Sequence, residues 1–518
     1  MYKLVWISLL MGLNFSAGAQ QLVPEINGPE IFGVRPGKKF IYPLSISGAL
    51  PLKIKIGGLP KGVRLDRKSG VLTGKILDTG KHSLKVTVSN RHGYFVRDLT
   101  IKVGAKLALT PPMGWSSWYA YGRNVTQAKI ELTAKLMKEN GLQQAGWNLL
   151  ELDDPWSKQP LASDTVWKTL KSHDKNGVFM YFEGPDNLAD RRGTGRDQRG
   201  NLVPNSFFPD LKGMVNTLHR TGFKAGIYSS PGPITCAGAS GSLGHEFIDA
   251  KYWSDLGFDY LKYDWCSYGA YAPDSTRSTY SKPYRLMADA LLAQDRDIVF
   301  ALCQYGLGKV WEWGNEAGGQ LWRTDGDIRD NWKSVYTAMK KLSDKSEFVQ
   351  PGNWNDPDIL QIGVIGGNDD QGEKRNNKLS QEEQRTHFSM WCMLSAPLLI
   401  GANIEYIEEE TLAILKNRKL IAINQDGLGK AAYLAKTLAN GLEVWYKPLS
   451  DGSMAMAVLN PTSQTVVDVV SFTDLGLAGT TISLEDQWSD RILKLDEKGR
   501  LALTIPSHGV QIIKCSLK

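Results

Sequence analysis

The stretch HEFIDAKYWSDLGFDYLKYDW, residues 245–265, joins an amphipathic helical segment to a short apolar strand. The same order follows directly: PYRLMADALLAQ (283–294) has helical spacing, and IVFALCQ (298–304) is an apolar run. Further units of this kind extend in both directions. Repeated strand and helix units imply parallel strands joined by crossover helices. Their number and total length predict a (β/α)8 barrel over residues 106–428. A doubly wound sheet is the alternative, but no glycine-rich phosphate loop follows the first strand.

Segments with strand periodicity lie on both sides of the barrel. In residues 20–105, runs such as HSLKVTVSN (82–90) alternate apolar and polar residues. This part resembles the immunoglobulin-like β modules found on bacterial surface and secreted enzymes. We favour a packing spacer over a carbohydrate-binding module, because no exposed aromatic pair is evident. In residues 429–518, a hairpin with Asp451-Gly452 at its turn predicts a C-terminal antiparallel β-sandwich. The predicted fold class is therefore multidomain, α/β plus all-β.

The first nineteen residues have the pattern of a secretory signal peptide. Lys3 precedes the apolar run 4–13, and Ala17-Gly18-Ala19 is a small-residue cleavage site. The run is too short to span a bilayer, and no later stretch is long and apolar enough. We expect cleavage after Ala19 and export, to the periplasm or outside the cell.

Composition excludes several classes of protein. A chain of 518 residues is too long for one core, which implies two or three domains. With 42% hydrophobic and 22% charged residues it is neither mostly disordered nor a polytopic membrane protein. The net charge of +7 comes without a Lys/Arg block, so no nucleic acid partner is expected. The mature chain has five cysteines, which leaves at least one thiol unpaired, and their spacing indicates no metal site.

Acidic residues follow several of the predicted barrel strands. Active residues of such barrels emerge at the carboxyl ends of the strands. The acids at these ends are Asp153, Asp154, Asp264, Asp325, Asp327, Asp356 and Asp358. Tryptophans lie among them in the sequence. One Asp after a strand is often only a helix cap or turn residue, but five or six are not explained in that way. Carboxylates and tryptophans at one barrel mouth predict a glycosidase, which needs two carboxyl groups around the glycosidic bond.

Ordered motifs then indicate a family. They are LALTPPMGWSSWYAYG (107–122), LLELDDPW (149–156), GFKAGIYSSPGPITCAG (222–238), GFDYLKYDWC (257–266), LWRTDGDIRDNW (321–332), GNWNDPDIL (352–360), SAPLLIGANI (395–404) and IAINQDGLGK (421–430). Together they resemble glycoside hydrolase family 27, the clan D α-galactosidases and α-N-acetylgalactosaminidases, over residues 105–515.

The resemblance implies a role for each matching residue. Asp264 would be the nucleophile and Asp327 the general acid/base of a retaining mechanism, with no metal or organic cofactor. Cys236 and Cys266 would form a disulfide beside the catalytic strand. The implied sugar-binding and pocket-lining residues are Trp118, Asp153, Asp154, Tyr228, Lys262, Gln304, Arg323, Asp358 and Ile359. In this reading Asp153 and Asp154 bind the galactose O4 and O6, and Gln304 lies near the 2-hydroxyl.

The chain also departs from the family. Pro155 and Gly319 stand where relatives have cysteines, so Cys303 is expected to be a buried thiol. Residues 157–198 form an insertion that could wall the leaving-group subsite or pack on itself. The expected activity is that of an exo-α-galactosidase acting on α-galactoside-containing glycans. A β-L-arabinopyranosidase or α-N-acetylgalactosaminidase stays an alternative, as, remotely, does a non-catalytic carbohydrate-binding protein. Neither the aglycone nor the oligomeric state follows from the sequence.

Overall fold

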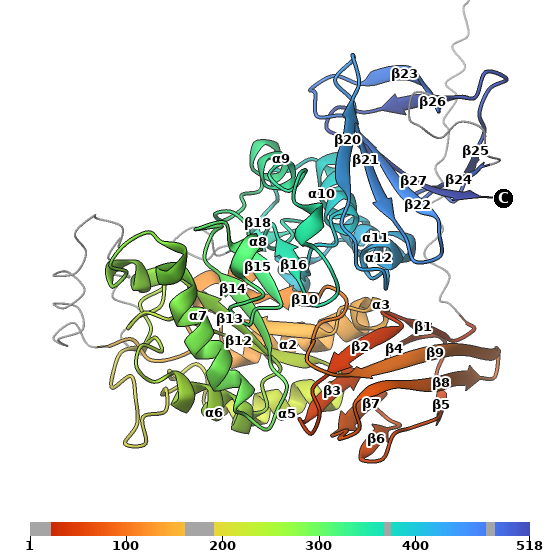
Figure 1. Ribbon diagram of the computed structural model, residues 1–518. Coiled ribbons are helices and arrows are strands. Elements are labelled where there is room, and N and C mark those ends of the chain that lie inside the picture. The colour runs from red at the N-terminus through yellow and green to blue at the C-terminus, as the bar shows by residue number, and fades with distance from the viewer. Residues whose placement is uncertain (1–21, 161–190, 367–373, 473–481, 518) are drawn as a thin grey trace, which may run out of the picture.

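The computed structural model describes residues 22–160, 191–366, 374–472 and 482–517. Three hydrophobic cores occur in this part of the chain: one in the N-terminal β region, one in the barrel and one in the C-terminal sandwich (Figure 1). The predicted signal peptide, residues 1–19, lies outside the described residues, as does most of the predicted insertion 157–198. No helix in the described ranges is long and apolar enough to cross a membrane.

Eight parallel strands form the central sheet, as predicted. They are β10 (Met113–Ser116), β11 (Leu149–Leu152), β12 (Lys224–Ser229), β13 (Tyr260–Asp264), β14 (Val299–Cys303), β15 (Leu321–Arg323), β16 (Trp354–Asp356) and β19 (Leu398–Ile400). Neighbours in the sheet follow the chain order, and β19 pairs with β10. A parallel bridge from Leu360 to Ile400 joins the segment after β16 to β19, which closes the sheet into a barrel.

Helices cover the outside of the barrel. They are α1 (Ser117–Tyr121), α2 (Gln127–Glu139), α3 (Leu142–Ala145), α5 (Leu211–Thr221), α6 (Glu246–Leu256), α7 (Arg277–Leu292), α8 (Val310–Trp313), α9 (Trp332–Lys340), α10 (Gln381–Met393), α11 (Glu409–Leu415) and α12 (Arg418–Asn424). Helix α5 shows why such segments form: its buried side chains recur at helical spacing, Asp210 caps its start, and Gly222 ends it in a left-handed conformation. Helix α7 begins six residues before the predicted Pro283, because Thr276 caps the helix earlier.

The C-terminal region is a β-sandwich of a six-stranded and a two-stranded sheet. The six strands are β20 (Tyr433–Thr437), β21 (Glu443–Pro448), β22 (Met454–Leu459), β27 (Val510–Leu517), β24 (Ile482–Asp486) and β25 (Ile492–Leu493), in that order. The two are β23 (Val466–Ser471) and β26 (Arg500–Ile505). Strand alternation gives β21 two apolar faces: Val444 and Tyr446 face the sandwich core, whereas Trp445 packs with the barrel core.

The N-terminal region consists of strands around its own core. They are β1 (Glu25–Asn27), β2 (Ile31–Val34), β3 (Phe40–Pro43), β4 (Ser45–Ser47), β5 (Lys53–Gly57), β6 (Val63–Asp66), β7 (Val71–Gly74), β8 (Gly80–Asn90) and β9 (Gly93–Val103). The main sheet has the order β2-β9-β8-β5, and a second sheet has the order β3-β7-β6. The strands were predicted; their likeness to immunoglobulin-like modules stays a prediction.

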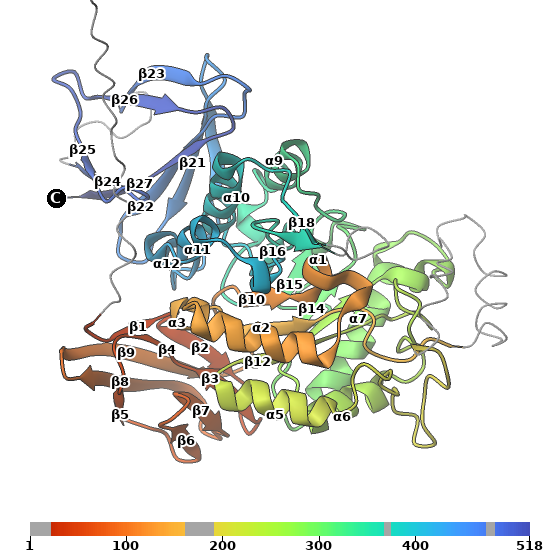
Figure 2. The same ribbon diagram turned by 180° about the vertical axis from the view of Figure 1, so that it is seen from behind.

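This N-terminal β module packs under the barrel. The Lys39 backbone exchanges hydrogen bonds with Asp295 and Asp297, just before β14, and the Arg35 amide donates to the Asp297 carboxylate at 2.8 Å. A cavity between the two parts is also lined by residues at or before the starts of β10 to β14. The module therefore covers the amino ends of the strands, on the side of the barrel opposite to their carboxyl ends (Figure 2).

Candidate active site

A pocket of about 360 Å³ lies at the carboxyl ends of the barrel strands. It is lined by Trp118, Tyr119, Asp153, Tyr228, Cys236, Lys262, Asp264, Tyr305, Arg323, Asp327, Asp358 and Ile359. Nine of these twelve belong to the site or pocket residues that the motifs pointed to, and Cys236 to the predicted disulfide. Residues more than 200 positions apart in the sequence meet here because parallel strands end at the same rim.

Asp264 ends β13 and is held by two tyrosines. The hydroxyl of Tyr228 donates to Oδ2 at 3.0 Å, and the hydroxyl of Tyr305 donates to Oδ1 at 2.5 Å. Burial raises the pKa of Asp264 to about 6; the charge of Lys262 and the Tyr305 hydrogen bond oppose this rise. The carboxylate therefore has a fixed orientation and faces the pocket with both oxygens already hydrogen-bonded.

Lys262 carries positive charge into the same space. It lies two residues before Asp264 on β13, hence on the same face of the strand. Its ammonium donates to Asp153 Oδ2 at 2.7 Å. Burial alone would lower the pKa of Lys262, but Asp153 and the neighbouring acids raise it well above its usual value. The group stays charged and helps to keep Asp264 ionised.

Arg323 links the remaining acids of the pocket. At the end of β15, its guanidinium lies 3.2 Å from Asp327 Oδ1 and 3.1 Å from Asp358 Oδ1. Asp358 Oδ2 also accepts hydrogen bonds from the Tyr119 hydroxyl and the Ile328 amide. Both oxygens of Asp358 are thus bound within the wall of the pocket. The φ of Asp358 is +94°, in the left-handed region. Asp327 is the freer acid, with a side chain that is 48% exposed.

The electrostatics of Asp327 differ from those of Asp264. Burial against the pocket raises the pKa of Asp327, but Arg323 and Lys262 more than offset this, so that the pKa lies below its usual value. The two carboxyl groups therefore have opposite shifts: the pKa of Asp264 is raised and the pKa of Asp327 is lowered.

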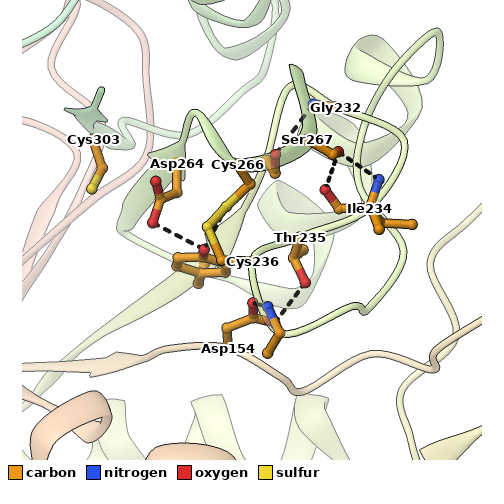
Figure 3. Close-up of a disulfide and its surroundings, with 12 residues drawn as sticks. Asp154, Gly232, Ile234, Thr235, Cys236, Asp264, Cys266, Ser267 and Cys303 are labelled. Carbon is orange, nitrogen blue, oxygen red and sulfur yellow. Dashed lines mark hydrogen bonds between the residues drawn. A yellow bond between two sulfur atoms is a disulfide. The ribbon is translucent and has the colours of Figure 1, made fainter. Parts of the chain in front are cut away.

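Two predicted sugar contacts do not line the pocket. Asp154 and Asp153 both follow the end of β11 but have different partners, since Asp153 accepts from Lys262 and Asp154 from the loop after β12. Its oxygens accept from the Thr235 hydroxyl at 2.8 Å and the Ala237 amide at 2.6 Å (Figure 3). Burial raises the pKa of the Asp154 carboxyl to about 7, and these two hydrogen bonds oppose the rise. In this structure Asp154 holds the loop that carries Cys236 rather than facing a sugar.

Gln304 is the second predicted residue that does not line this pocket. It is fully buried, and neither amide atom has a hydrogen-bond partner among the described residues. The preceding Cys303 ends β14, and its sulfur lies 3.7 Å from an Arg323 nitrogen. Tyr305 reaches the pocket in its place, with a φ of +64°. Tyr305 was not among the predicted site residues, because it lies in a turn after β14 and no strand periodicity places it at the pocket.

The disulfide Cys236–Cys266 is present, next to Asp264 (Figure 3). It joins the loop after β12 to the segment just after β13, so one covalent bond links a pocket wall to the strand that carries Asp264. Cys303 is a buried free thiol, as predicted, together with Cys392 and Cys515. The two disulfide sulfurs and Asp264 lie close together, but disulfide sulfurs are not thiolate ligands, so this trio is no metal site.

Comparison with known proteins identifies the family. A family model described as alpha galactosidase A matches residues 180–426, and one described as the alpha galactosidase C-terminal beta sandwich domain matches residues 439–515. The α-galactosidase of Cyamopsis tetragonoloba is 34% identical over 410 residues, which are 78% of this chain and 86% of the relative.

The chain belongs to the α-galactosidase family.

Other members of the α-galactosidase family extend the likeness. Alpha-galactosidase A of Cellvibrio japonicus is 30% identical and covers 79% of this chain and 93% of its own length. A solved candidate α-galactosidase/melibiase from Bacteroides fragilis has 32% identity and a TM-score of 0.83, over 96% of this chain and 98% of that one. The solved α-galactosidase I of Mortierella vinacea has a TM-score of 0.66 over 80% of this chain. The Bacteroides structure therefore matches nearly the whole chain, N-terminal β module included.

Proposed function

We propose that the chain is a retaining exo-α-galactosidase that removes terminal α-galactosyl residues from glycans. The observation that carries this proposal is the meeting of Asp264 and Asp327 in one pocket, with the Asp153–Lys262 pair beside them. The two carboxyl groups provide a nucleophile and an acid for one glycosidic bond. The small volume of the pocket suits one sugar at the end of a glycan rather than the middle of a chain.

The chemistry takes two steps. An oxygen of Asp264 attacks the anomeric carbon, the glycosidic bond breaks, and Asp327 gives its proton to the departing oxygen. Asp327, now a carboxylate, then takes a proton from water as the water oxygen attacks the same carbon and displaces Asp264. The sugar leaves with its original anomeric configuration. Because Asp327 is half-exposed at the rim, it can reach both the leaving group and the incoming water.

A panel of nitrophenyl glycosides tests the substrate. We expect the α-galactoside to be hydrolysed at least tenfold faster, in kcat/KM, than the β-L-arabinopyranoside or the α-N-acetylgalactosaminide. The Asp264→Ala variant should lose turnover on all three. An intact, folded protein that hydrolyses none of them would contradict the proposal and favour a non-catalytic carbohydrate-binding protein.

One observation favours β-L-arabinopyranoside as a second substrate. The family resemblance assigned Asp154 to the galactose side of the pocket, yet its carboxylate is engaged by Thr235 and Ala237. The pocket then has one acid fewer for the C6 hydroxyl, which arabinopyranose lacks. A preference for the arabinopyranoside in the panel would show that Asp154 does not serve the sugar.

We further propose that the protein is exported with cleavage after Ala19. The sequence pattern of residues 1–19 supports this, as does a disulfide beside the catalytic strand, since disulfides persist in oxidising compartments. Expression with the native N-terminus in a Gram-negative host should give a mature protein that begins at Gln20. Recovery of the full-length chain from the cytosol would contradict export.

A further inference from the structure

We infer that the N-terminal β module binds an acidic polysaccharide through the outer face of its main sheet. The first observation is a strong charge asymmetry along the chain. Residues 22–105 contain ten lysines and five arginines but only five acids, a net charge of +10. Residues 106–518 contain 45 basic and 49 acidic residues, a net charge of −4. Such an asymmetry indicates an anionic partner for the basic part.

Part of this charge gathers on one face. Strand register places directly paired residues on the same side of a sheet, so the solvent face of β5, β8 and β9 can be followed residue by residue. The rows across it are Lys53–Ser89–Tyr94, Lys55–Thr87–Val96, Gly57–Lys85–Asp98, Ser83–Thr100 and Lys81–Lys102. The five lysines are exposed, and the face has one acid. Figure 1 shows β5 and β8 on the side of the module away from the barrel.

These lysines are not engaged within the protein. None of the five lies within salt-bridge distance of a carboxylate in the described part of the chain, although Lys85 is directly opposite Asp98 in the sheet. Lys81 lies directly opposite Lys102, a pairing of like charges that costs stability. Protection of a sheet edge explains lysines on β5, which is an edge strand, but not those on the central strands β8 and β9.

The other side chains indicate which polyanion fits. Ser83, Thr87, Ser89 and Thr100 place hydroxyl groups between the ammonium groups. Tyr94 is 72% exposed and presents a ring at one end of the face. The face has no arginine, the residue preferred for two-point contacts with phosphate. Ammonium and hydroxyl groups with an aromatic ring suit the carboxylates, hydroxyls and ring faces of an acidic polysaccharide.

The location agrees with a binding role. The module packs against the amino ends of the barrel strands, whereas the pocket lies at their carboxyl ends. A polymer held on this face leaves the pocket open, so the module would concentrate the enzyme on acidic glycan material without competing for the site.

The test uses the full mature protein and polygalacturonate as the probe, in affinity electrophoresis and calorimetry at 50 mM salt. The Lys53→Glu/Lys55→Glu/Lys85→Glu variant should bind at least tenfold more weakly. The control is Lys138→Glu/Lys282→Glu/Lys494→Glu, which changes the net charge equally at exposed lysines elsewhere, and it should bind within twofold of wild type. Wild-type binding should weaken at least tenfold between 50 and 500 mM salt.

Several outcomes would overturn the inference: no retention of the wild type by polygalacturonate, equal loss in both triple variants, or equal or tighter binding to anionic phospholipid vesicles or duplex DNA. Nitrophenyl glycoside hydrolysis and the melting temperature should match wild type in both variants. If charge reversal prevents folding, the same three lysines changed to glutamine replace it. Binding and catalysis are measured separately, so failure of the proposed enzymatic function would not affect this result.

Discussion

At the scale of single residues, the position of Asp264 depends on its hydrogen-bond donors. Tyr228 and Tyr305 donate to its two oxygens from different strand ends. Tyr228 belongs to β12, whereas Tyr305 lies in the loop after β14, held in a left-handed conformation and followed by Gly306 with a φ of +82°. A carboxylate with both oxygens engaged cannot rotate freely, which prepares one oxygen for attack.

We expect the Tyr305→Phe variant to lower kcat on nitrophenyl α-galactoside by roughly 10–100-fold, because one aligned donor to the reacting carboxylate is lost. The ring and its packing remain, so the melting temperature should change little. Tyr433→Phe, at an exposed hydroxyl on β20, is the control and should be neutral. A Tyr305→Phe enzyme with wild-type kcat would show that the 2.5 Å contact does not act in the reaction.

The pH profile follows from the two carboxyl groups. The reactive form has one proton on the pair, with Asp264 ionised. Since the pKa of Asp264 is about 6 and that of Asp327 is below its usual value, kcat/KM should decline above about pH 6 and again in strong acid. With Asp327→Ala and a dinitrophenyl leaving group, only ionised Asp264 is required. The direction of the pH dependence then reverses: the activity of the variant should rise with pH as Asp264 loses its proton, and then reach a plateau.

The same variant identifies the acid. Natural galactosides need protonation of the leaving oxygen, whereas dinitrophenolate does not. Asp327→Ala should therefore lose about a hundredfold or more on a natural oligosaccharide and far less on the dinitrophenyl substrate. Equal losses on both, or an alkaline limb that persists in the variant, would show that another group supplies the proton.

At the scale of elements, loops after the barrel strands decide what faces the pocket. The loop after β12 is fixed twice: Cys236 is bonded to Cys266, and the residues on either side of Cys236 hydrogen-bond to Asp154. A buried carboxylate thereby connects the end of β11 to a wall formed by the neighbouring strand end. The acid therefore fixes the shape of the loop that carries Cys236.

Removing Asp154 should therefore reduce stability as well as affinity. Asp154→Ala leaves the buried Ala237 amide without its acceptor, which costs about 1–3 kcal/mol. We expect a lower melting temperature and a higher KM with all glycosides of the panel. If Asp154 instead bound the sugar directly, the variant would keep its melting temperature and lose activity selectively on the galactoside, not on the arabinopyranoside.

At the scale of the whole molecule, the C-terminal sandwich is joined to the barrel by polar as well as apolar contacts. The inward face of β21 bears Glu443, Trp445 and Lys447. Glu443 accepts from the Tyr336 hydroxyl and the Lys340 ammonium of α9. Lys447 donates to the Cys392 carbonyl, the Ser395 hydroxyl and the Ile423 carbonyl. The sandwich is therefore a structural support on the helical side of the barrel.

Lys447→Met tests this support. The substitution keeps much of the side-chain volume but removes three buried hydrogen bonds, at a cost of about 3 kcal/mol. We expect the first thermal transition to fall by several degrees while kcat at 25 °C stays unchanged, because Lys447 does not line the pocket. Lys494→Met, at an exposed position, should leave the transition unchanged. An unaltered transition in Lys447→Met would show that the interface does not depend on this ammonium.

Much of this organisation could be predicted from the sequence. Helical spacing with caps, as in α5, and short apolar runs, as in β13, are local signals, and they predicted the repeated units of the barrel. The acids that follow the predicted strands indicated where the pocket lies, since parallel strands bring their carboxyl ends to one rim. The family motifs added the individual residues, of which Asp264, Asp327, Lys262 and Arg323 all line the pocket.

What the sequence by itself determined was the order of the elements and the kinds of residue at the barrel mouth, because both depend on periodicity and on neighbours along the chain. Only the tertiary structure decided which of two adjacent residues faces the pocket. In a linear sequence nothing distinguishes Asp153 from Asp154, or Gln304 from Tyr305, as the residue that faces the pocket. Asp153 accepts from Lys262, whereas Asp154 is bound by Thr235 and Ala237. Tyr305 donates to Asp264, whereas Gln304 is buried and has no hydrogen-bond partner among the described residues. These partners come from different strands and loops, and only the folded chain brings them together.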